Sequence, residues 1–104
     1  MKRSEILDAA KKCVCGAREE QYGSPENNFS AIAALWDDYI FAAKRKEVFI
    51  TARDVALMMS LLKIAREATG GGKADNWIDL AGYAACGGEI YSILEGDMEA
   101  KQQQ

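Results

Sequence analysis

The stretch from Val55 to Ala65 constrains the fold most, because its residues are apolar on nearly every helical face. A surface helix of a small domain carries polar residues along one side, whereas this stretch contains only Ser60 and Lys63 as polar residues. Its apolar run is also too short to cross a bilayer. We therefore predict a central helix that is covered by the other helices or by a second subunit.

Helices are predicted for the rest of the chain as well. The 104 residues are enough for one domain, and a single proline with few β-branched residues favours helices. Apolar residues at helical spacing, together with capping residues, place four helices. They are expected from Ser4 to Tyr22, from Pro25 to Lys44, from Thr51 to Thr69, and from near Asp75 to about Asp97.

The resulting fold class is a single all-α domain over residues 1–104, a bundle of about four helices with a frayed tail at residues 101–104. Small residues such as Gly82, Gly87 and Gly88 weaken the fourth helix unless another backbone approaches it closely. We expect this helix and the central helix to form the interface of a homo-oligomer.

The two ends of the central helix carry local signals. Thr51 with Asp54 three residues later forms a short capping box, which is a sufficient structural role for Asp54. Gly70–Gly72 end the helix, and because three consecutive glycines have no packing use, we expect this loop to be mobile or to face a ligand.

Composition excludes several classes of function. A net charge of −3 with mixed signs argues against binding of duplex nucleic acid. The absence of histidine excludes Ser–His and Cys–His nucleophilic arrangements, and three cysteines, Cys13, Cys15 and Cys86, make a poor zinc site. These cysteines are expected to be reduced thiols, and no export signal or membrane span is present in the sequence.

Basic and aromatic residues near the central helix suggest a pocket for a nucleotide. Lys63 and Arg66 are three residues apart, close enough to bind one anion together, although cations near a helix C-terminus are also favourable on their own. An aromatic side chain could stack on a base, but aromatic residues more often belong to a core. The candidate ligand-binding residues are Arg18, Tyr22, Asn28, Lys63, Arg66, Lys73, Trp77 and Tyr83.

Acidic residues form a second candidate set. Asp75 and Asp79 are four residues apart on one helix face, where they repel each other unless a cation lies between them. That cation could be Mg²⁺ or a basic side chain. A role as a helix-start acid is favoured for Asp75, whereas a structural and a functional role are equally supported for Asp79.

Three segments resemble a small family that is common in phages and prophages. They are REEQYGSPENNF (Arg18–Phe29), DVALMMSLLKIAR (Asp54–Arg66) and KADNWIDLAGYAACG (Lys73–Gly87). The last segment is also similar to the Asp-x-x-x-Asp…Tyr element of the all-α MazG-like and dimeric dUTPase-like nucleotide pyrophosphatases. That resemblance implies Mg²⁺-dependent hydrolysis of nucleoside triphosphates through Asp54, Asp75 and Asp79. However, the Glu-Glu-x-x-Glu motif of those enzymes is missing from the preceding helix.

The resemblance to a phage family leads to three functional hypotheses. The first is a phage-encoded protein of the bacterial host cytoplasm that binds a nucleotide, similar to the small helical sponges that sequester cyclic-nucleotide immune signals. For this binder we expect no cofactor, and the incomplete acidic motif argues against enzymatic activity without deciding it. The second is a variant or degenerate Mg²⁺-dependent pyrophosphohydrolase. The third is a protein-interaction module that uses an apolar helix face.

Overall fold

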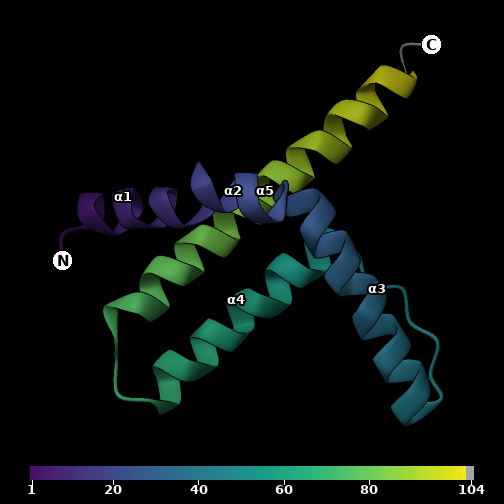
Figure 1. The fold of residues 1–104 in the computed structure, drawn as a ribbon, viewed down its shortest axis with the longest axis horizontal. Coiled ribbons are helices and arrows are strands. Elements are labelled where there is room, and N and C mark those ends of the chain that lie inside the picture. Colours follow the sequence, from purple (N-terminus) through teal and green to yellow (C-terminus); the bar gives the residue numbers. More distant parts are fainter. Residues whose placement is uncertain (103–104) are drawn as a thin grey trace.

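Five α-helices and no strand make up the part of the chain that the computed structural model describes, residues 1–102 (Figure 1). The side chains of residues 18, 19 and 94–102 lie outside this description. The all-α class is confirmed, with five helices instead of about four. They are α1 (Arg3–Val14), α2 (Ala17–Tyr22), α3 (Pro25–Lys44), α4 (Ala52–Thr69) and α5 (Ala74–Gln102).

A break at Gly16 divides the first predicted helix into α1 and α2. Gly16 has a φ of 70°, a left-handed conformation that glycine adopts without steric cost. The helix also begins earlier than expected, because Lys2 and not Ser4 is its N-cap residue. The end of α2 follows the prediction, since Gly23 comes directly after Tyr22 and has a φ of 81°.

The starts of α3 and α4 follow local signals in the sequence. Pro25 occupies the first turn of α3, where its missing N–H costs nothing. At the start of α4, the backbone N–H of Thr51 donates to Asp54 Oδ2 at 3.0 Å, and the backbone N–H of Asp54 donates to Thr51 Oγ1 at 3.1 Å. The predicted capping box is therefore confirmed.

A glycine turn joins α4 to α5, which lie side by side (Figure 1). Gly71 and Gly72 have φ values of 87° and 77°, which other residues rarely adopt. Glu67 Oε1 accepts hydrogen bonds from the backbone N–H of Lys73 at 3.2 Å and from Asn76 Nδ2 at 3.3 Å, which holds the turn against the end of α4. Gly71 and Gly72 therefore have a conformational role in this turn, and a loop that is mobile or faces a ligand stays a prediction.

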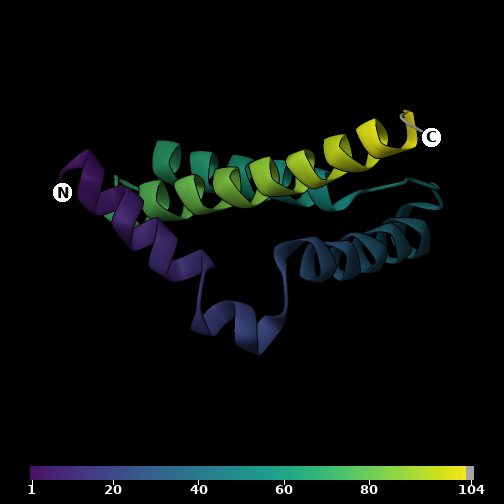
Figure 2. The ribbon, with the colours of Figure 1, turned by 90° about the horizontal axis from the view of Figure 1, so that it is seen from above.

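The other helices pack around this pair. α1 packs against α5 and α3 against α4, and Figure 2 shows α2 and α3 on one side of the α4–α5 pair. A Cβ atom at Gly82 would lie 3.0 Å from Val14 Cγ1, and one at Gly87 would lie 3.1 Å from Ala56 Cβ. Two of the small residues in α5 therefore allow close helix packing within the chain, as predicted.

The buried core is small for a chain of this length. Among the described residues, one cluster consists of Phe29, Ala33, Val55, Ala56, Cys86 and Ile90, of which Val55 is fully buried, and Ala10 of α1 is buried outside this cluster. The radius of gyration is 15.7 Å, whereas a compact domain of this size has about 13 Å. On α4, Leu57, Leu61 and Ile64 are 53%, 63% and 49% exposed. The predicted central helix is therefore covered on one side and bare on the other.

Candidate functional site

A pocket of about 250 Å³, here called the central pocket, lies where α1, α3, α4 and α5 meet, with Tyr22 of α2 at its wall. Its wall includes Asn28 and Phe29 from α3 and Asp79 and Tyr83 from α5. These residues come from helices far apart in the sequence, so only the folded chain brings them together. Four of the residues singled out from the sequence, Tyr22, Asn28, Asp79 and Tyr83, line this pocket.

Three aromatic residues, Tyr22, Phe29 and Tyr83, lie in the wall of the central pocket. The rings of Phe29 and Tyr83 have centroids 6.2 Å apart and planes tilted by 39°, a favourable geometry for an aromatic pair. Phe29 belongs to the buried core, and Tyr83 packs against that core while also lining the pocket. Both rings are therefore held in place by packing and present apolar surface to the pocket.

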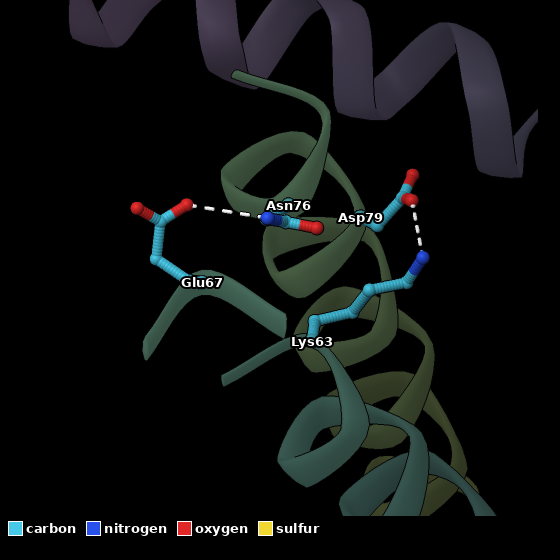
Figure 3. A network of polar contacts seen from close by, with 4 residues as sticks. All are labelled: Lys63, Glu67, Asn76 and Asp79. Atoms are coloured by element: carbon cyan, nitrogen blue, oxygen red, sulfur yellow. Dashed lines mark hydrogen bonds and ion pairs between the residues drawn. The ribbon is translucent and has the colours of Figure 1, made fainter. Parts of the chain in front are cut away.

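Asp79 is the one charged side chain among the described residues of this wall. Its Oδ2 atom forms an ion pair with Lys63 Nζ at 2.8 Å, and the two side chains are 35% and 12% exposed (Figure 3). The pair joins α5 to α4 across the packed helices. Two cations were considered beside Asp79, Mg²⁺ and a basic side chain. In the structure Lys63 is the basic side chain that pairs with it.

A second pocket of about 230 Å³, here called the hairpin pocket, lies near the glycine turn. It is lined by Lys63, Glu67, Asn76 and Trp77, together with three apolar residues. Trp77 is 53% exposed. Lys63 lines this pocket and Asp79 lines the central one, so their ion pair connects the two pocket walls.

Two of the three remaining predicted cations lie outside both pocket walls. Arg66 and Lys73 are exposed and belong to neither wall. Lys73 uses its backbone N–H, not its side chain, in the bond to Glu67. The side chain of Arg18 lies outside the described part of the chain. Phosphate binding by these three residues stays a prediction.

The acidic residues do not form a cluster suited to Mg²⁺ within one chain. Asp54 is engaged in the capping box with Thr51, Asp79 is paired with Lys63, and Asp75 is exposed in the first turn of α5. Among the residues that the structure describes, no three Asp, Glu or Cys side chains lie close enough to hold a metal ion. The donor set therefore does not fit a resident Mg²⁺, and we derive no metal-dependent step.

Several residues of the two pockets were not predicted from the sequence as ligand-binding residues. Cys13, Phe29 and Cys86 line the central pocket, and Glu67 and Asn76 line the hairpin pocket. Phe29 and Cys86 are at helical spacing from other apolar residues, which indicates that they are buried. This spacing does not indicate which pocket they line. Glu67 offers a usable signal, because an acid just before a glycine turn can accept the backbone N–H groups that follow it.

No described helix combines the length and the apolar composition that crossing a lipid bilayer requires.

Comparison with known proteins places the chain among phage proteins. Residues 5–91 match the family model described as a domain of unknown function, DUF6378. The Gene 55 protein of Mycobacterium phage D29 is 41% identical over 93 residues, which cover 88% of this chain and 58% of the relative. The Gene 55 protein of Mycobacterium phage L5 is 42% identical over 79 residues, covering 76% of this chain and 47% of the relative.

The chain thus spans about half the length of the curated relatives it matches. No solved structure matches it. The predicted likeness to a phage family is confirmed, whereas a relation to MazG-like pyrophosphatases stays a prediction. On the match over residues 5–91 and the two phage relatives, this chain belongs to the DUF6378 family.

Proposed function

We propose that this chain binds a nucleotide-like small molecule in the central pocket and holds it without chemical change. The observation that carries the proposal is that Tyr22, Asn28, Asp79 and Tyr83, from three helices, line one pocket. Binding pockets for small molecules are mostly apolar and contain a few polar groups that orient the ligand. The rings of this pocket suit the face of a base, and its amide and carboxylate suit the polar edge.

Retention of the ligand, and not turnover, is the activity that the residue set favours. The described wall contains no histidine and no acidic cluster that could activate water. A protein that only binds could act for a phage by sequestering a nucleotide or cyclic-nucleotide signal of host immunity.

We also propose that the chain works as a homo-oligomer that covers the bare side of α4. Leu57, Leu61 and Ile64 follow one another at spacings of four and three residues, so they form one stripe. Each of them is about half exposed or more. Contiguous apolar surface of this kind commonly marks an interface between proteins. Because the core of the single chain is small, burial of this stripe against a second copy would stabilise the fold.

Calorimetric titration with a panel of nucleotides and cyclic dinucleotides tests the binding proposal. We expect at least one of them to bind and to be recovered intact after the complex is heated, with and without Mg²⁺. Asn28→Ala should weaken binding by about 1 kcal/mol, because it removes the hydrogen bonds of one neutral amide. Asn27→Ala is the matched control, since Asn27 is the exposed neighbour and lies outside the pocket wall.

Two results would count against the proposal. If no nucleotide in the panel binds, the pocket has another purpose. If a nucleotide is recovered as a Mg²⁺-dependent hydrolysis product, the chain is an enzyme, and retention is the wrong description.

A further inference from the structure

The polar groups of the central pocket determine which edge of a ligand they can recognise. An ionised carboxylate only accepts hydrogen bonds, whereas a side-chain amide both donates and accepts. In the described wall, Asp79 is the sole charged group, and Asn28 is the sole amide. Phosphate oxygens are poor partners for such a carboxylate, because both groups are negative. The pocket therefore favours the N–H-bearing edge of a ligand.

The geometry of Asp79 leaves part of its carboxylate available for a ligand. Its Oδ2 atom is occupied by the ammonium of Lys63 at 2.8 Å. Figure 3 shows the second oxygen turned away from that ammonium. An N–H that reaches this carboxylate forms a charge-assisted hydrogen bond, which is stronger than a bond between neutral groups.

The common nucleobases differ in the donors that they offer to a carboxylate. Guanine presents two adjacent donors, the N1–H and the N2 amino group, which match the two oxygens or one shared oxygen of a carboxylate. Adenine and cytosine present one amino group beside an acceptor, and uracil and thymine present one N–H between two acceptors. Guanine also has O6 and N7 acceptors, which an amide such as that of Asn28 can meet with its N–H groups.

The volume of the pocket limits how much of a ligand it can enclose. At about 250 Å³, it lies below the range of about 300–1,000 Å³ that is typical of pockets for drug-sized molecules. One base with its sugar is a reasonable occupant, whereas two nucleosides exceed the space. Each chain therefore offers a site for a single nucleoside unit.

We propose that the central pocket selects a guanine mononucleotide or nucleoside, with Asp79 accepting from the N1 and N2 donors of the base. This selectivity rests on the proposed function, because it presumes that a nucleotide occupies the pocket. Tyr22, Phe29 and Tyr83 supply apolar surface for the faces of the base, and Asn28 meets its acceptor edge.

Calorimetric titration of the full chain with the monophosphates of guanosine, inosine, adenosine and uridine tests this selectivity. Guanosine monophosphate should bind tightest. Inosine monophosphate lacks only the N2 amino group, so it should bind roughly 10- to 100-fold more weakly, the loss expected for a hydrogen bond to a charged acceptor. This comparison uses the unmodified protein, so it does not depend on any variant being folded.

Two variants separate recognition by Asp79 from its structural role. Asp79→Asn should reduce the preference for guanosine over inosine monophosphate to within about threefold, because the neutral amide oxygen is a weaker acceptor than the carboxylate and the amide NH₂ group cannot accept from either donor. Lys63→Met breaks the same ion pair but keeps the carboxylate, so the preference should remain. Asp38→Asn, at an exposed position of α3 outside the pocket wall, controls for the change in net charge.

The outcomes distinguish this inference from the function on which it rests. Binding of all four nucleotides with similar affinity overturns the guanine selectivity and leaves the binding proposal intact. Unchanged selectivity in folded Asp79→Asn also overturns it. If no nucleotide binds, the proposed function fails, and the selectivity fails with it.

Discussion

The ion pair between Lys63 and Asp79 should be asymmetric, so that loss of the aspartate destabilises the fold more than loss of the lysine. The lysine side chain is only 12% exposed, whereas the aspartate side chain is 35% exposed. Asp79→Asn leaves a mostly buried ammonium without its counter-ion, while Lys63→Met leaves a carboxylate that water can still solvate. The methionine also preserves the apolar stem of the lysine, which packs along the helix surface.

The distance and the exposure bound the energy of this pair. At the observed 2.8 Å, Coulomb's law with an effective dielectric constant of about 20 gives roughly 6 kcal/mol before desolvation and screening. Desolvation offsets most of that value, and fully exposed pairs contribute about 0–1 kcal/mol. We therefore expect the free energy of unfolding to fall by about 1.5–2 kcal/mol for Asp79→Asn and by about 0.5 kcal/mol for Lys63→Met. The coupling energy between the two side chains should be near ~1 kcal/mol.

Urea unfolding of the two single variants and the double variant measures this coupling. All proteins should be compared at one concentration, because self-association would shift the apparent stability. Lys44→Met and Asp38→Asn change the same charges at exposed positions of α3 and serve as controls. A coupling energy near zero, or a larger cost for Lys63→Met than for Asp79→Asn, would refute the reasoning.

Three further predictions concern packing and capping. If the chain forms the proposed homo-oligomer, Leu61→Glu should convert it to monomers in light scattering, whereas Leu7→Glu, at a position that is also 63% exposed, should not. An unchanged mass for Leu61→Glu rules out this face as the interface. Gly87→Val should destabilise the fold by about 1–3 kcal/mol in thermal melts, because its side chain meets Ala56. Gly88→Ala should stabilise the fold by about 0.5–1 kcal/mol, because no atom lies within 4 Å of a Cβ atom at that position and alanine favours the helix. Equal effects of the two substitutions would exclude steric packing as the cause. Asp54→Ala should lower the free energy of unfolding by about 1 kcal/mol in the same melts and leave nucleotide binding unchanged. Loss of binding in a folded variant would indicate that Asp54 has a role beyond capping.

Local signals in the sequence predicted local structure well. The capping box of Thr51 and Asp54 needs only four consecutive residues, and it is present in the structure as predicted. Gly16 shows the limit of such signals. A single glycine within a helical pattern can be tolerated or can break the helix, and only its surroundings in the folded chain decide.

The candidate site was harder to predict, because helical periodicity says which residues share a face but not which helix covers that face. Lys63 and Arg66 are three residues apart, yet Lys63 is largely buried beside Asp79, whereas Arg66 is exposed. Phe29 is at helical spacing from Ile32 and Trp36, which indicates a shared apolar face, but its place in the wall of the central pocket depends on how α3 crosses α4 and α5. Long-range packing of this kind cannot be derived from spacing alone.

The packing of α1 against α5 has a consequence for how the chain is made. Val14 of α1 lies so close to α5 that a Cβ atom at Gly82 would be 3.0 Å from Val14 Cγ1, and α3 and α4 lie between these helices in the sequence. During synthesis, α1 leaves the ribosome well before α5 exists, and closing so long a loop is entropically slow. We therefore expect α3 and α4 to associate first, so that the earliest helix to be translated is among the last to find its native partner.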